Sequence, residues 1–142
     1  MGSIKIIPSG ERNREAVSRL VERGFLTPET YAAMPAGERS AHVFVHHPGA
    51  AATPQLVELS LDPDIEVQPH AHGADEIIFI LEGSISFGAR ECPAGSSVLI
   101  EKDTLYTFRV GPQGVTFLNF RPSGDFNHYS KEEFLARRSA AR

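Results

Sequence analysis

Short apolar stretches separated by Gly, Pro and Asp make up most of the chain from Ala41 onward. Short strands at regular spacing are typical of a closed sandwich or barrel, whereas a parallel sheet alternates its strands with helices. The pattern therefore predicts an all-β domain. Its strands are expected at 42–46, 55–61, 64–70, 76–82, 84–89, 96–101, 104–110 and 114–120.

One of these strands, 76–82, is apolar at its five central positions. The five residues from Ile77 to Leu81 do not alternate with polar residues, as they would in a strand that faces water on one side. Such a strand is covered on both faces, one by the barrel interior and the other by a further layer or subunit. The sequence therefore predicts a homodimer.

Helical patterns precede the strands. Residues 11–23 carry an apolar stripe at helical spacing, and Gly24 is suited to end that helix. A second short helix is expected after Thr27, which can cap it, with Pro28 in the first helical position. Residues 34–40, which contain Pro and Gly, are expected to form a loop.

A helix is also expected after the strands. Ser130 and Glu133 have the spacing of a capping box, which marks the start of a helix. The 142 residues are thus expected to form a single domain with a helical N-terminal arm at 1–40, a β-barrel at 41–122, and a tail with the C-terminal helix at 123–142.

The charge pattern narrows the class of partner. The net charge is −4, and Lys and Arg are scattered, whereas nucleic-acid binding needs a concentrated basic stripe. The longest apolar run is far too short to cross a bilayer. The N-terminus lacks the pattern of a secretory signal, and the single cysteine, Cys92, cannot form an internal disulfide. We therefore expect a cytoplasmic protein that binds neither nucleic acid nor membranes.

The candidate chemistry lies at the turn after the third predicted strand. His70 and His72 are two residues apart, so their side chains leave one face of a strand about 7 Å apart at the backbone. Gly73 eases a tight turn that returns Glu76 beside them. Two imidazoles and one carboxylate can hold a metal ion and leave positions open for substrate. A purely structural zinc site usually closes its shell with thiolates, and this chain has only one cysteine.

This segment resembles the first motif of the cupin superfamily: His-x-His, three residues, Glu, six residues, Gly. The motif positions are held by His70, His72, Glu76 and Gly83. A degenerate second motif opens at Gly95, and Tyr106 stands where the family has its fourth metal ligand, a His. The resemblance covers roughly residues 55–120 and implies a small RmlC-like jelly-roll barrel, that is, a cupin-type double-stranded β-helix with short N-terminal helices and a C-terminal helix.

Both the spacing and the resemblance point to one divalent metal ion, with His70, His72 and Glu76 as its ligands. Fe(II), Mn(II), Ni(II) and Zn(II) all tolerate this ligand set, so the identity of the metal stays open. Tyr106 has three possible roles. It is a phenolate ligand in the fourth position, a proton donor or acceptor beside the ligands, or a filler of the barrel mouth.

The resemblance implies a site more than a reaction. The leading hypothesis is a metal-dependent enzyme that acts on a small organic molecule by oxygenase-, lyase- or isomerase-type chemistry, with Tyr106 and Glu76 as the catalytic residues that handle protons. The alternative is a non-catalytic module that binds or senses a small molecule and has a degenerate metal site.

Other residues are weaker candidates. His42 or His46 would supply the fourth ligand only if their face of the first predicted strand looked inward, and we expect them at the surface instead. His128 lies in the tail, from which it could close over the barrel mouth. Phe108 and Phe117 are expected either to pack in the core or to line an apolar pocket.

Overall fold

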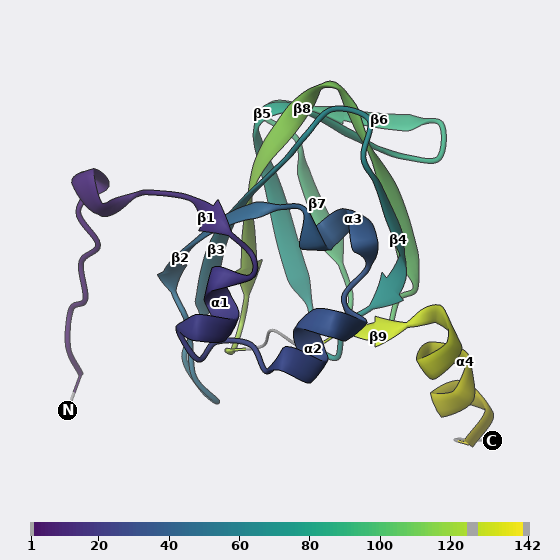
Figure 1. Cartoon of the computed structure of the whole chain (residues 1–142), viewed down its shortest axis with the longest axis horizontal. Helices are drawn as coiled ribbons and strands as arrows, with labels where there is room; N and C mark the ends of the chain where they lie inside the picture. The colour runs from purple at the N-terminus through teal and green to yellow at the C-terminus, as the bar shows by residue number, and fades with distance from the viewer. Residues whose placement is uncertain (1, 125–127, 141–142) are drawn as a thin grey trace.

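The computed structural model describes residues 2–124 and 128–140, and its antiparallel strands curve into a barrel (Figure 1). The strands are β1 (Glu15–Ala16), β2 (His42–His47), β3 (Gln55–Leu61), β4 (Glu66–Ala71), β5 (Glu76–Phe87), β6 (Arg90–Pro93), β7 (Ser97–Ile100), β8 (Tyr106–Arg121) and β9 (Tyr129–Ser130). The helices are η1 (Ser9–Glu11), α1 (Arg19–Glu22), α2 (Pro28–Ala33), α3 (Ala36–Arg39) and α4 (Lys131–Ala140). The all-β class predicted from the strand pattern is confirmed.

Two pairs of predicted strands are each one long, bent strand. β5 runs through the predicted break at Gly83, and β8 runs through the predicted break at 111–113 and on through Gly114. Both glycines have positive φ angles, +73° and +80°. A Cβ atom on Gly83 would lie 1.9 Å from the carbonyl oxygen of Gly114, so the two backbones can approach this closely only because glycine lacks that atom. The predicted breaks are wrong because glycine lets a strand bend without ending its hydrogen-bond ladder.

β8 is shared by the two walls of the barrel. Its first part, up to Arg109, pairs with β4, and its last part, residues 115–121, pairs with β3. β5 pairs with both parts, and the register shifts beside Gly83. The two parts of β8 therefore belong to opposite walls, and side chains from both reach the interior. β6, which the sequence analysis missed, forms a short hairpin with the end of β5.

The helix predicted at 11–23 is wrong for most of its length. Arg12 and Arg14 both donate hydrogen bonds to the buried carboxylate of Glu58 in β3, at 2.7 Å each for the shortest contact. β1 then pairs with β2, and only the four residues of α1 are helical. Tertiary contacts at the arginines and the β1 pairing thus override the helical periodicity of this segment.

The other helices follow their local signals. The Thr27 hydroxyl accepts a hydrogen bond from the Thr30 N–H at 3.0 Å at the start of α2. Ser130 likewise accepts from the Glu133 N–H at 3.1 Å at the start of α4, which packs beside β4 and β9. The loop expected at 34–40 instead contains the single-turn helix α3, which is too short to leave a periodic pattern. In the described part of the chain, no helix has the length and apolar character needed to cross a membrane.

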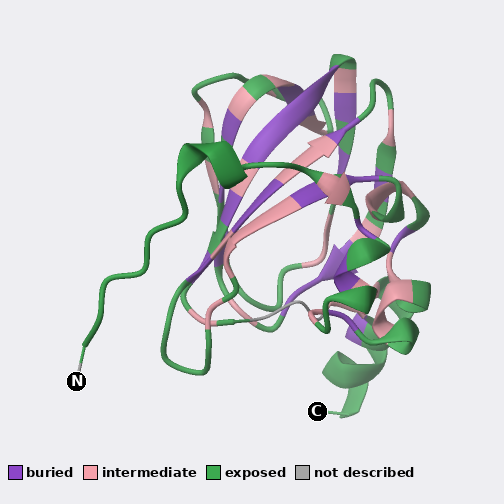
Figure 2. Cartoon of the chain, turned by 60° about the vertical axis from the view of Figure 1, so that its left-hand side comes forward, coloured by how far each residue is buried: buried purple, intermediate pink, exposed green. Residues whose placement is uncertain are grey.

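The outer face of β5 carries apolar side chains that the described part of the chain leaves partly exposed. Ile77 and Phe79 are each 42% exposed, and Leu99 and Phe120, which are the register partners of Ile77, are also exposed. The inner face of the same strand is buried, and the N-terminal arm before β1 is exposed along its length (Figure 2). The predicted homodimer would cover this face, and it stays a prediction.

Candidate active site in the barrel

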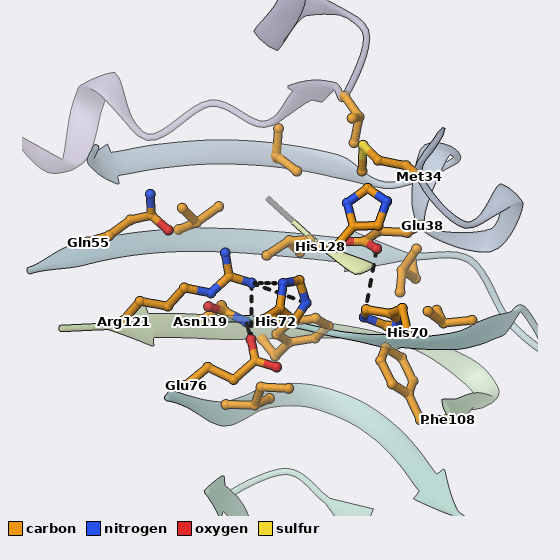
Figure 3. Close-up of a pocket in the computed structure, with 18 of the residues that line it drawn as sticks. Met34, Glu38, Gln55, His70, His72, Glu76, Phe108, Asn119, Arg121 and His128 are labelled. Carbon is orange, nitrogen blue, oxygen red and sulfur yellow. Dashed lines mark hydrogen bonds and ion pairs between the residues drawn. The ribbon is translucent and has the colours of Figure 1, made fainter. Parts of the chain in front are cut away.

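A cavity of about 70 Å³ lies inside the barrel, and the residues singled out in the sequence line it together. His70, His72, Glu76 and Tyr106 come from β4, the turn after it, β5 and β8. The last part of β8, which pairs with the start of β5 beside Glu76, adds Asn119 and Arg121. In Figure 3, Glu76 and the ends of these two side chains lie close to His72, while His70 faces Glu38. The rest of the lining is largely apolar.

His70 presents one ring nitrogen to the cavity as an acceptor. Its side chain is 2% exposed, and Nδ1 lies 2.8 Å from the carbonyl oxygen of Gln68. Because a carbonyl can only accept, Nδ1 carries the proton of this hydrogen bond. In the neutral ring the lone pair is therefore on Nε2, which lies on the cavity side near Glu38.

His72 is a neutral imidazole at pH 7. It lies in the turn after β4, where its carbonyl oxygen accepts a hydrogen bond from the Asp103 N–H at 2.9 Å. Burial of the ring, and then the positive charge of Arg121, lowers the pKa of His72 to about 4. Its ring stands edge-on to that of His70, with centroids 5.0 Å apart.

Glu76 accepts hydrogen bonds on both carboxylate oxygens. Tyr106 donates to Oε1 at 2.5 Å, while Asn119 Nδ2 and Arg121 Nη2 donate to Oε2 at 2.7 and 3.1 Å. Burial by itself would raise the pKa of Glu76, but the charge of Arg121, the proximity of His72 and these hydrogen bonds lower it below its ordinary value. Glu76 is therefore an ionised carboxylate in the interior.

Tyr106 is a hydrogen-bond donor to Glu76. Burial, and then the negative charge of Glu76, raises the pKa of Tyr106 well above its ordinary value, so the hydroxyl keeps its proton. Its ring also contacts His70, with centroids 4.5 Å apart. Of the three roles that the sequence left open, this geometry favours the proton donor beside the site over the phenolate ligand.

Arg121 is the main residue that the sequence analysis missed. It alternates with Phe117 and Asn119 along β8, so the strand period places it on the inner face. Its side chain is buried, and Nη2 lies 3.5 Å from each ring nitrogen of His72. Arginines are almost never fully buried without a partner, so an arginine near the end of a strand is normally predicted to lie at the surface. This is why the sequence analysis did not single out Arg121.

The predicted metal site does not fit a divalent ion in this arrangement. Among residues 2–124 and 128–140, no three His, Cys, Asp or Glu side chains are placed so that they could hold a metal ion. Both oxygens of Glu76 are engaged, one of them by a guanidinium that also reaches His72. Metal binding at His70, His72 and Glu76 would require Arg121 to leave Glu76, and the metal stays a prediction.

The N-terminal helices and the tail close one side of the cavity. Met34 and Glu38 line it from the segment around α3, and His128 lines it from the tail. His128 donates from Nε2 to the carbonyl oxygen of Ala33 at 3.0 Å, and its ring centroid lies 6.4 Å from that of His70. Sequence reasoning treated His128 as a weak candidate that could close over the barrel mouth, and it gave no signal for Glu38.

The remaining candidates are not part of a metal site. His42 is exposed, and His46 lies 3.1 Å from Glu58 in the cluster that holds the N-terminal arm, as the expected surface placement implies. Phe108 and Phe117 combine the two roles that the sequence left open, packing in the core and lining a pocket. They pack edge-to-face in the core, with centroids 6.3 Å apart, and they line the cavity.

Comparisons with known proteins establish the fold. No family model matches the sequence, and no curated protein sequence matches it. The polyketide cyclase RemF from Streptomyces resistomycificus superposes with a TM-score of 0.64 at 20% identity, covering 91% of this chain and 86% of RemF. An RmlC-like cupin from Shewanella frigidimarina gives 0.57 at 14% identity, covering 87% and 94%. KdgF from Halomonas sp. gives 0.57 at 16%, covering 88% and 97%.

These identities are low, so the likeness speaks for the architecture alone. The chain is a protein with the cupin fold. Its barrel is of the RmlC-like kind that the first motif predicts from the sequence.

Proposed function

We propose that this chain is a cupin-fold enzyme that acts on a small organic molecule in the barrel cavity. The observation that carries the proposal is the buried cluster of His70, His72, Glu76, Tyr106 and Arg121 at one cavity. Burying ionisable groups costs free energy that an apolar core would not, so such a cluster in a cavity is typical of a functional site. Enzymes among the solved structures of similar fold, such as the polyketide cyclase RemF, support the proposal.

The cluster is suited to proton transfer. Nε2 of His70 can take a proton from an O–H or an acidified C–H of the substrate, whose electron pair then stays on the substrate. Arg121 provides a positive charge in the same cavity for the oxygen on which negative charge develops. Tyr106 and Glu76 form a fixed hydrogen-bonded pair that holds this end of the site. These roles suit isomerase- or lyase-type chemistry.

The size of the cavity limits the substrate. The cavity of about 70 Å³ is several times the roughly 10–15 Å³ that a single water needs, so it admits a group of a few heavy atoms. The reacting part of the substrate is therefore small, and any larger part has to extend toward the side closed by α3 and the tail.

The test compares substrate consumption by variants. Purified protein is incubated with a mixture of cellular small molecules, and the compounds that disappear or form are measured by mass spectrometry. We expect His70→Gln to lose the change that the wild type produces and His42→Ala, outside the cavity, to keep it. Binding of a compound that is released unchanged would favour the non-catalytic binding module. Identical profiles for the wild type and His70→Gln would refute the proposal.

A second candidate is the metal-dependent enzyme, with Fe, Mn, Ni or Zn at His70, His72 and Glu76. One observation favours it: the Nδ1–H of His70 is held by the Gln68 carbonyl, as it is in many imidazole ligands of metals. Metal analysis of protein purified without chelators separates the candidates. A near-stoichiometric metal that His70→Ala and Glu76→Ala both lose supports the second, and turnover by metal-free protein supports the first.

A further inference from the structure

Glu38, a residue of the N-terminal segment, faces the barrel interior and lines the cavity. α3 packs against β4, and this contact places Glu38 beside His70. Glu38 Oε2 is buried, and no described residue donates a hydrogen bond to it. A buried carboxylate oxygen without a donor is unfavourable, and such groups are rare in proteins unless something else contacts them.

The distance between Glu38 and His70 is the second observation. Glu38 Oε2 lies 4.0 Å from Nε2 of His70, which is beyond the length of a hydrogen bond. Because Nδ1 of His70 donates to Gln68, Nε2 of the neutral ring is an acceptor, as is the carboxylate. Two acceptors thus face each other across a gap at the edge of the cavity, and only a group that donates two hydrogen bonds can satisfy both.

The gap matches a single atom that donates two hydrogen bonds, such as an amine nitrogen or a water oxygen. A donor about 2.8 Å from each of two acceptors, the usual length of a charge-assisted hydrogen bond, sees them at an angle close to 90° when they are 4.0 Å apart. The N–H bonds of an amino or ammonium group diverge by a similar angle. A hydroxyl carries only one proton and would leave one acceptor unsatisfied.

The charge of the cavity favours a cation over a neutral donor. Among the described lining residues, the charged side chains other than histidine are Glu38, Glu76 and Arg121. Arg121 is paired with Glu76 at 3.1 Å, which leaves the Glu38 carboxylate as the uncompensated charge. A positively charged group beside Glu38 is therefore stabilised, most strongly where water is excluded.

We propose that Glu38 and His70 bind the amino group of a small organic amine, and that the cavity takes such amines as its ligands. The inference rests on the proposed function of the same cavity and specifies its substrate class. It also gives the N-terminal segment a role in binding, beyond that of a packing arm.

The test measures binding of methylamine, ethylamine and propylamine to the whole chain by calorimetry, with ethanol and 1,2-ethanediol as neutral probes of similar size. We expect the wild type to bind at least one amine at least tenfold more tightly than either alcohol. Glu38→Gln, which keeps the shape of the side chain, should weaken amine binding at least tenfold. Glu29→Gln, an exposed residue on the neighbouring helix α2, is the matched control and should bind like the wild type.

Several outcomes would overturn the inference: no amine binds the wild type, Glu38→Gln binds amines as the wild type does, or an alcohol binds as tightly as the amines. Binding of Zn²⁺ without binding of any amine would assign the pair to a metal and would also overturn it. The turnover assay keeps the two proposals distinct. If Glu38→Gln retains a turnover that His70→Gln loses, the proposed function stands and the amine inference fails. If amines bind through Glu38 but no compound is turned over, the amine inference stands and the proposed enzymatic function fails.

Discussion

Arg121 Nη2 donates a hydrogen bond to Glu76 Oε2 at 3.1 Å inside the barrel, where the sequence predicts that Glu76 binds a metal ion. Both side chains are almost fully buried, at 9% and 1% exposed. A buried ion pair contributes little net stability, because taking both charges out of water costs about as much as their attraction returns. The pair therefore sets the electrostatic character of the cavity more than it stabilises the fold.

Removing one member of this pair should be costly. Arg121→Met leaves the Glu76 carboxylate buried without its countercharge, and such changes lower the free energy of unfolding by about 3 kcal/mol. The pKa of Glu76 should rise in the same variant, because Arg121 is the main influence that lowers it. Urea denaturation at pH 7 measures the first effect. Arg90→Met, at an exposed position of β6, is the control and should unfold like the wild type.

The same substitution tests the metal prediction. With the guanidinium gone, Oε2 of Glu76 becomes available, and we expect Arg121→Met to bind Zn²⁺ at least tenfold more tightly than the wild type in competition with a chelating dye. The double variant Arg121→Met/Glu76→Ala should lose this gain. Equal or weaker affinity in Arg121→Met would show that the arginine does not compete with a metal at this carboxylate.

Glu58 should make stability depend on pH below about 4.5. Burial alone would raise its pKa, but hydrogen bonds from Arg12, His46 and Arg14 lower it to about 2. Because the pKa of Glu58 is lower in the folded state than in the unfolded state, its contribution to the free energy of unfolding is complete above about pH 4.5. That contribution is lost as the pH falls toward 2. Because both arginines are partly exposed, we expect a loss of about 1–2 kcal/mol.

The measurement for Glu58 is the free energy of unfolding in urea at pH 6, 4 and 3. Glu58→Gln should be less stable than the wild type at pH 6, and the gap should narrow at pH 3. If the two stabilities fall in parallel over this range, the carboxylate is not the group responsible.

Gly83 should not tolerate a side chain. Its φ angle is +73°, and a Cβ atom would lie 1.9 Å from the carbonyl oxygen of Gly114, so alanine combines backbone strain with a clash against backbone. We expect Gly83→Ala to lower the free energy of unfolding by at least about 2 kcal/mol. Gly88→Ala has an unfavourable φ of +61° but nothing within 4 Å, so it isolates the strain and should cost less.

The apolar outer face of β5 predicts the homodimer. Light scattering on protein eluted from a size-exclusion column should give twice the mass of one chain. The Phe79→Asp variant should instead give the mass of a monomer. Leu135→Asp, on the exposed side of α4, removes an apolar residue of similar exposure elsewhere and should leave the mass unchanged. A monomeric wild type at micromolar concentration would contradict the prediction.

The sequence predicts the gathering of His70, His72 and Glu76 from local rules, whereas Tyr106 is predicted beside them by the resemblance to the second cupin motif. The strand period puts His70 on an inner face, and a tight turn brings Glu76 back beside it. The positions of Arg121 and Glu38 have no comparable local cause. Arg121 follows the period of β8, but its charge favours the surface. Glu38 reaches His70 only because α3 packs on β4, which is a tertiary contact between segments far apart in the chain.

The strands were easier to place than the segments before them. β3 has the predicted bounds, because apolar residues and turn signals define both of its ends. The helix expected at 11–23 fails because Arg12 and Arg14 have a stronger partner in Glu58 than a helix could offer them. Side-chain partners in a distant strand cannot be read from the spacing of apolar residues.

The continuity of β8 across both walls ties the geometry of the cavity to strand register. Tyr106 lies at one end of this strand and Arg121 at the other, and both donate to the same carboxylate. A slip of β8 by one residue against β5 would turn both side chains outward and leave Glu76 buried without donors. The donors of Glu76 therefore move together, whereas Glu38 and His128, which line the same cavity from other segments, can be substituted without shifting that register.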